Sequence, residues 1–151
     1  MKFKLTDIAR VQNEERFKQP LLFDGMNVGK MYPTDIDAFT EYHDWFFITM
    51  EVKGAGVPLN YGQTTALERL TDTILKANKT SILFICRHNV TDSTRPIFLK
   101  DTTVTEIYYC GVWYTVSPRS ALEAYQYAMD WAQAIEKGGY NATRTTNPFL
   151  Q

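Results

Sequence analysis

Apolar and polar residues alternate most regularly between residues 32 and 54, and the alternation predicts two short β-strands, 35–42 and 45–53. In the second strand the even-numbered positions are all apolar, whereas the odd-numbered positions end in Glu51 and Lys53. Successive side chains of a strand point to opposite faces of its sheet. One face of this strand is therefore buried, and the other becomes charged at its far end.

The length of the loop between these strands decides whether their acidic residues meet. A two-residue loop would set Ile36 opposite Glu51 and send the carboxylates of the two strands to opposite faces. We therefore predict a three-residue loop, from His43 to Trp45, or a bulge. Either one sets Asp37 opposite Glu51 on a common face.

The remaining chain alternates between helical and strand periods, and it predicts a mixed α/β or α+β fold in a single domain over residues 1–151. The apolar run at 81–86 is typical of a central strand covered on both faces, and it completes a strand–helix–strand crossover. Elements are expected at 6–18 (helix), 21–23 (edge strand), 61–77 (helix packed on the sheet), 81–86 (strand), 103–115 (one or two strands, broken at Gly111), and between Ser117-Pro118 and Gly138-Gly139 (a last helix with the stripe Leu122, Tyr125, Met129, Ala132 and Ile135).

The composition is that of an ordinary soluble globular protein, with 44% hydrophobic and 22% charged residues. No apolar run is long enough for a membrane span, and the charged N-terminal stretch favours a cytoplasmic protein. Cys86 and Cys110 lie in apolar, strand-like runs and are expected to be reduced and packed. A net charge of −1 gives no general attraction to nucleic acid, so any positive groove must be local.

Asp35, Asp37, Glu51 and Lys53 have the chemistry of a metal-dependent phosphodiesterase. Phosphodiester hydrolysis needs a water made nucleophilic near neutral pH and charge neutralised at phosphorus, and Mg²⁺ supplies both. Mg²⁺ is held by one or two carboxylates together with water and substrate oxygens, so acids from two adjacent strands suffice. Lys53 follows Glu51 on the same face, where its ammonium group can orient the water or stabilise developing charge.

At these residues the sequence resembles the PD-(D/E)XK nuclease superfamily, whose signature is an acid on one strand and acid-x-Lys on the next. The matching residues are Asp37, with Asp35 as the alternative, and Glu51-Val52-Lys53. The short separation of Asp37 from Glu51 is similar to that of the Holliday-junction-resolvase-like branch. The resemblance implies the catalytic residues Asp37, Glu51, Lys53 and Gln63, and the metal ligands Asp37, Glu51, Val52 and Asp35.

The resemblance also implies a restriction-endonuclease-like core of helix, three strands, helix and strand, with the C-terminal strands and helix as additions. The implied activity is hydrolysis of DNA phosphodiester bonds by a Mg²⁺-dependent endonuclease, structure-specific or phage-type, with Mn²⁺ as a second usable metal. A homodimer is one implied assembly. Glu14 or Glu15 would match a glutamate that some members carry on the first helix.

Several of these candidate residues also have an ordinary structural interpretation. Gln63 can simply be the partner of Asn60 at a helix start, and Glu14 and Glu15 can form a solvated helix face. His88, beside Arg87, is either a solvated strand end or a phosphate contact. The aromatic residues Tyr108, Tyr109, Trp113 and Tyr114 suit core or dimer packing better than stacking on bases.

The whole chain also has alternative functions. A catalytically inactive module of the nuclease fold would bind nucleic acid or a protein partner without hydrolysing anything. A structural or assembly protein that carries the motif by accident is the more remote alternative. Measurements of metal binding and of DNA cleavage distinguish these two alternatives from a nuclease.

Overall fold

A computed structural model describes residues 20–138 and Phe149, and the chain divides after Pro33 into two units. In the first unit an isolated bridge joins Val28 to Met31. The edge strand predicted at 21–23 is wrong, because these residues form no ladder with the described residues and Leu21 and Leu22 are exposed. The helix predicted at 6–18 lies outside the described residues, and a single domain stays a prediction.

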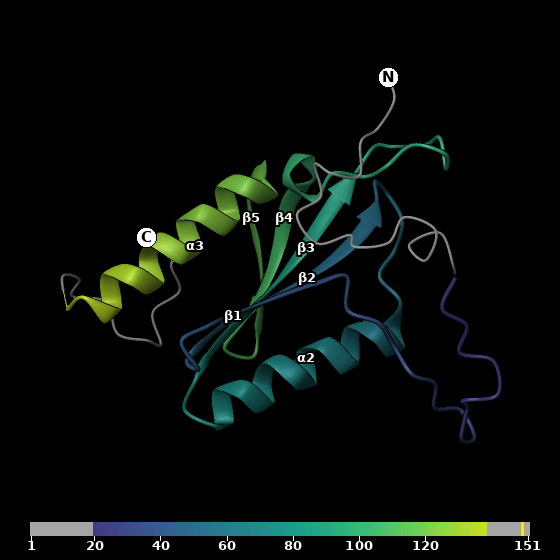
Figure 1. The fold of residues 1–151 in the computed structure, drawn as a ribbon, viewed down its shortest axis with the longest axis horizontal. Helices are drawn as coiled ribbons and strands as arrows, with labels where there is room; N and C mark the ends of the chain where they lie inside the picture. The colour runs from purple at the N-terminus through teal and green to yellow at the C-terminus, as the bar shows by residue number, and fades with distance from the viewer. Residues whose placement is uncertain (1–19, 139–148, 150–151) are drawn as a thin grey trace. The chain divides into compact units, whose positions relative to one another are not determined.

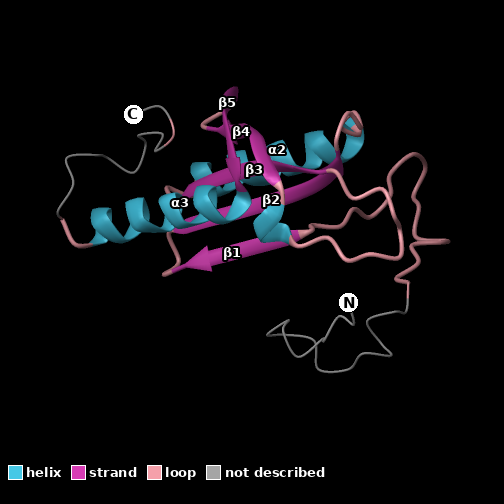
Figure 2. Cartoon of the chain, turned by 90° about the horizontal axis from the view of Figure 1, so that it is seen from above, coloured by secondary structure: helices cyan, strands magenta, loops and turns pink. Residues whose placement is uncertain are grey.

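The second unit contains a five-stranded mixed sheet between two helices, as Figures 1 and 2 show. The mixed α/β class predicted from the sequence is therefore confirmed. Strand β2 and the central strand β3 run parallel, and every other neighbouring pair is antiparallel. In spatial order the strands are β1 (Ala38–Tyr42), β2 (Phe46–Gly54), β3 (Thr80–His88), β4 (Thr103–Tyr109) and β5 (Val112–Ser120).

The loop between β1 and β2 has the three residues that the sequence predicts, His43 to Trp45. Tyr42 pairs with Phe46, and the register runs back to Ala38 opposite Met50. His43 and Asp44 adopt left-handed φ values of 49° and 59°, which reverse the chain within this short loop. Strand β1 begins at Ala38 and not at residue 35 as predicted, and its ladder with β2 runs only as far as Ala38 opposite Met50. Asp37 directly precedes this strand and contacts β2 through the main-chain N–H of Val52.

Helix α2 (Tyr61–Lys76) begins and ends close to the predicted bounds and connects the parallel strands β2 and β3. Asn60 caps it, because its side-chain oxygen accepts hydrogen bonds from the N–H groups of Gly62 and Gln63. Leu67 of α2 packs against Leu83 of β3 and the residues around it. The predicted crossover unit is confirmed.

Strand β3 is covered on both faces, as the apolar run at 81–86 predicts. Its even-numbered residues, such as Phe84, pack into the cluster beneath α3 (Ala121–Glu136), and its odd-numbered residues, such as Ile85, pack toward α2. Cys86 is a buried free thiol, and burial raises its pKa to about 11. Cys110 is also free and is half-buried.

Strands β4 and β5 form a hairpin whose turn is Cys110-Gly111, both with positive φ, so the predicted break at Gly111 is confirmed. The helix start predicted at Ser117-Pro118 is wrong, because both residues belong to β5. Proline is tolerated there since β5 is an edge strand. Helix α3 begins after Ser120, which forms a reciprocal capping box with Glu123.

The packed face of α3 includes most of the predicted stripe, since Ala132 is buried and Tyr125, Met129 and Ile135 pack against the same core. Leu122 is 43% exposed, whereas Ala124, Ala128 and Trp131 are buried against the sheet. Small alanine side chains let the helix approach the strands closely, so Ala124 and Ala128 are completely buried while the larger Leu122 is not. The helix ends near Gly138, as predicted. Neither α2 nor α3 has the length and apolar character needed to cross a membrane.

Candidate active site

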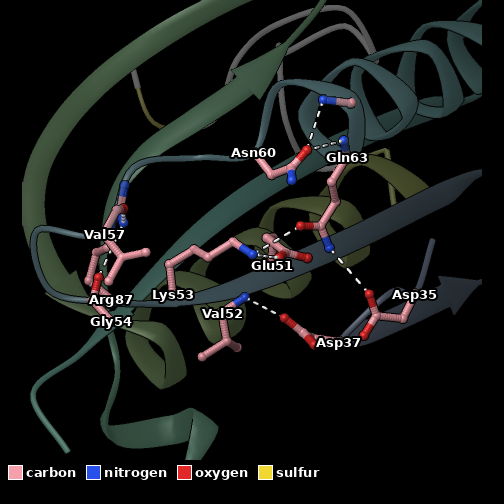
Figure 3. Close-up of polar contacts among 11 residues, drawn as sticks. Asp35, Asp37, Glu51, Val52, Lys53, Gly54, Val57, Asn60, Gln63 and Arg87 are labelled. Carbon is pink, nitrogen blue, oxygen red and sulfur yellow. Dashed lines mark hydrogen bonds and ion pairs between the residues drawn. The ribbon is translucent and has the colours of Figure 1, made fainter. Parts of the chain in front are cut away.

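The predicted site residues meet at the end of β2, beside the first turn of α2 (Figure 3). Glu51 and Lys53 lie on the sheet face that α2 covers, since their β3 neighbours Ile85 and Arg87 share that face. The helix crosses back so that Gln63, in its first turn, reaches Lys53. One continuous segment of the chain thus supplies the whole arrangement.

A chain of polar contacts links four of these side chains. The Lys53 ammonium nitrogen lies 2.8 Å from Glu51 Oε1 and donates a hydrogen bond of 2.9 Å to Gln63 Oε1. The Gln63 amide nitrogen donates in turn to Asp35 Oδ1 at 3.3 Å. Gln63 is therefore more than a helix-start residue, because its side chain holds Lys53 on one side and Asp35 on the other.

Asp37 occupies a different place from Asp35. Its Oδ2 accepts a hydrogen bond of 2.7 Å from the main-chain N–H of Val52, just before β1 begins at Ala38. Asp37 thus contacts the main chain of β2 at Val52, the residue between Glu51 and Lys53. Asp35 instead contacts the side chain of the helix residue Gln63. The two aspartates are not interchangeable.

Glu51 has a buried carboxylate, and one of its two oxygens accepts no hydrogen bond from the described residues. Its side chain is 3% exposed; Oε1 pairs with Lys53, and no donor among the described residues reaches the buried Oε2. Burial is the main cause that raises the pKa of Glu51, and the negative charges of Asp37 and Asp35 add to it, while Lys53 opposes the rise. A buried charged acceptor without a partner costs about 1–3 kcal/mol or more.

The donor set fits a hard cation. The described residues contain no group of three or more histidine, cysteine or acidic side chains arranged for a metal. Mg²⁺, however, needs only one or two protein carboxylates beside water and substrate oxygens, and Asp37 and Glu51 provide two. Glu51 Oε2, which no donor of residues 20–138 reaches, is the atom that a cation would contact. Val52 has an apolar side chain, so it could contribute only its main-chain carbonyl.

The sheet register reveals two further charged residues that the sequence pattern did not assign to the site. Arg87 of β3 is the neighbour of Lys53, and Glu106 of β4 lies in the same row as Glu51, with Ile85 between them. The Arg87 guanidinium donates to the carbonyl oxygens of Gly54, the last residue of β2, and of Val57 in the β2–α2 loop, and it lies 3.5 Å from Glu106. Only the pairing of β3 with its neighbours identifies them.

Other candidate residues lie elsewhere. Glu14 and Glu15 are outside the described residues. His43 lies in the hairpin loop, as predicted, and its ring contacts Glu136 at the end of α3. The aromatic residues of β4 and β5 are mostly structural, as predicted: Tyr108 and Tyr109 are buried, and the Trp113 indole donates to Glu68 of α2.

Comparisons of the chain with protein-family models, with curated proteins and with solved structures gave no significant match.

Proposed function

We propose that the protein is a Mg²⁺-dependent nuclease that hydrolyses DNA phosphodiester bonds, with Mn²⁺ as an alternative metal. The observation that supports this most is the buried Glu51 carboxylate, whose Oε2 lacks a donor among the described residues beside the paired ammonium of Lys53. An arrangement that is unfavourable for a folded chain alone becomes favourable once a divalent cation binds.

In this proposal Asp37, Glu51 and the Val52 carbonyl hold the metal, and Asp35 is the alternative acidic ligand. Bound Mg²⁺ would lower the pKa of a water and neutralise charge on the phosphate. Lys53 orients the attacking water or stabilises the charge that develops in the transition state. Gln63 keeps the Lys53 ammonium in place through its 2.9 Å hydrogen bond and restrains Asp35 through its amide nitrogen.

We also propose that β1, β2, α2 and β3 correspond to the later part of a restriction-endonuclease-like core. Two antiparallel strands, a helix and a strand parallel to the second one follow in the expected order. The correspondence is partial, because among residues 20–138 only β1 and β2 precede α2 as strands. Strands β4 and β5 and helix α3 would then be additions to that core.

Cleavage of plasmid and branched DNA tests the proposal. We expect cleavage with Mg²⁺ that EDTA abolishes, and loss of at least about a hundredfold in rate for Lys53→Ala and Glu51→Gln. Lys76→Ala is the matched control, because it removes a lysine charge from the exposed end of α2, away from the site. A folded wild-type protein that cleaves no nucleic acid with any divalent metal contradicts the proposal.

A second candidate function is a binding module of the same fold without catalysis. The contacts of Lys53 favour this candidate, because its ammonium group already forms an ion pair with Glu51 and a hydrogen bond to Gln63. In that case calorimetry would detect no Mg²⁺ or Mn²⁺ binding, and Lys53→Ala would leave binding of nucleic acid or of a protein partner unchanged. Mg²⁺ binding that disappears in Glu51→Gln contradicts this candidate.

A further inference from the structure

A cavity of about 430 Å³ lies within the long loop that joins β3 to β4. Its lining starts at Arg87 and His88, the last residues of β3, and includes Arg95, Ile97 and Asp101. The volume lies within the ~300–1,000 Å³ that is typical of small-ligand sites. The cavity is therefore large enough for one nucleotide and too small for a duplex.

The cavity adjoins the candidate active site through Arg87. In the parallel register of β2 and β3, Arg87 is the neighbour of Lys53, and His88 is the neighbour of Gly54. Neighbouring strands lie ~4.8 Å apart. A nucleic acid strand bound at Lys53 could therefore extend toward the cavity past Arg87.

Two hydrogen-bond donors on the cavity wall suit a phosphate. Arg95 lies in an exposed part of the loop, and its guanidinium has no hydrogen-bond or ion-pair partner among residues 20–138. His88 accepts a hydrogen bond at Nδ1 from the N–H of Val90, at 3.1 Å. A ring that accepts at Nδ1 carries its hydrogen on Nε2, which can donate to a ligand.

The acidic residues that line the cavity indicate which class of ligand it can bind. Asp92 is committed to its own turn, because one of its oxygens accepts from the Thr94 N–H and hydroxyl. Asp101 also lines the cavity, and its carboxylate would repel a simple polyanion. A nucleotide suits this mixed wall better, since its phosphate can contact Arg95 while an amino group of its base donates to Asp101. Ile97, 44% exposed, offers an apolar surface for the sugar or base.

We propose that this cavity receives one unpaired nucleotide of the substrate strand, with its phosphate bound by Arg95. The choice of ligand rests on the proposed nuclease function, because the cavity adjoins Lys53. A base stacked and paired in a duplex has to leave its stack to enter such a cavity. The substrate class is therefore nucleic acid with an unpaired stretch beside the cleaved bond, such as a single strand, a flap or a branch point.

Fluorescence anisotropy in EDTA tests this without cleavage, using a labelled single-stranded DNA and the same strand annealed to its complement. We expect the wild type to bind the single strand about tenfold more tightly than the duplex, and Arg95→Gln to weaken single-strand binding about three- to tenfold. Arg95→Gln should also reduce the slope of log affinity against log salt by about 0.7, the value for one phosphate contact on a single strand.

The matched control is Arg69→Gln, which removes a charge from the exposed surface of α2 outside the cavity. Equal losses in the two variants, or equal affinity for single strand and duplex, would overturn the proposal. Titration with deoxyadenosine 5′-monophosphate, followed by NMR, is the second measurement. Shifts confined to amides of residues 87–103 support the nucleotide site, and the absence of shifts there overturns it.

The two proposals fail in distinguishable ways. Arg95-dependent binding of single strands without any cleavage contradicts the nuclease activity and leaves the nucleotide site standing. Mg²⁺-dependent cleavage with binding indifferent to Arg95→Gln contradicts the nucleotide site alone.

Discussion

Asp37 directly precedes β1, whose first residue Ala38 pairs with Met50, and its carboxylate accepts a 2.7 Å hydrogen bond from the main-chain N–H of Val52. The side chain thus takes the place of a strand carbonyl at the end of the ladder. Asp37 therefore has a structural role as well as the proposed metal-binding role, and substitutions can separate the two.

Asp37→Asn keeps an oxygen for the Val52 N–H and removes the negative charge. We expect its free energy of unfolding to stay within about 0.5 kcal/mol of the wild type and its Mg²⁺ affinity to fall about tenfold or more. Asp37→Ala should lose Mg²⁺ affinity in the same way and should also lose the hydrogen bond from the Val52 N–H. We expect the loss of that bond to lower the free energy of unfolding by about 1 kcal/mol. Urea unfolding and calorimetry check this; an Asn variant that binds Mg²⁺ like the wild type assigns the metal to Asp35 instead.

Glu51→Gln should raise the melting temperature of the metal-free protein at neutral pH. Burial raises the pKa of Glu51, so the folded chain favours the protonated carboxyl. That contribution to stability is complete below the unfolded pKa and is lost as the pH rises through the raised pKa. The advantage of the glutamine should therefore vanish as the pH is lowered toward about 4.

Added Mg²⁺ provides the control for Glu51. It should raise the melting temperature of the wild type but not that of Glu51→Gln, because only the carboxylate binds the ion. Scanning calorimetry over a pH series, with and without Mg²⁺, measures both effects. If Glu51→Gln is less stable than the wild type at neutral pH without metal, the prediction is wrong. The ion pair of Glu51 with Lys53 then stabilises the folded chain by more than burial of the carboxylate destabilises it.

Glu136→Gln should have the opposite dependence on pH. The Tyr42 hydroxyl and the Trp45 indole donate to Glu136 at 2.8 and 2.9 Å, and the hydrogen bond from Tyr42 is the main cause that holds the pKa of Glu136 below its usual range. Stability from a lowered pKa is present above the unfolded pKa and is lost as the pH falls through the folded one.

We therefore expect Glu136→Gln to lower the melting temperature slightly at neutral pH and to match the wild type in acid. The effect should be small because Glu136 is solvent-accessible. Asp130→Asn, a charge change at an exposed position elsewhere on α3, is the comparison variant. A loss that is the same at every pH would assign the effect to packing.

Ser120→Ala should destabilise the protein by about 1 kcal/mol, because it removes the side chain that caps α3. Ser117→Ala is the matched control and should change the free energy of unfolding by less than about 0.5 kcal/mol, since Ser117 is an exposed residue of β5. Urea unfolding of both variants distinguishes the observed helix start from the one that the Ser117-Pro118 pattern predicts.

The features that the sequence predicts correctly depend on local chemistry. The three-residue loop at His43, the cap at Asn60 and the turn at Gly111 are each determined by neighbouring residues, and the burial of β3 follows from its continuous apolar run. The parity of β2 places Glu51 and Lys53 on one face for the same reason.

What the sequence does not predict depends on neighbours distant in the chain. Arg87 and Glu106 join the surroundings of the site only through the pairing of β3 with β2 and β4. Ser117-Pro118 has the residues of a helix start, but its place on an edge strand allows the proline to remain in the sheet. The Glu51 oxygen that has no donor within the described part of the chain likewise follows from burial, which no local pattern specifies.

The parallel pairing of β2 with β3 also bears on how the protein folds. All the proposed catalytic side chains precede β3 in the chain, yet β2 is held in the sheet by a strand that follows α2. Pairing across a crossover closes a long loop and is slower than forming a hairpin. During refolding the β1–β2 hairpin should therefore form first, and the site should acquire its geometry only when residues 80–88 dock beside it.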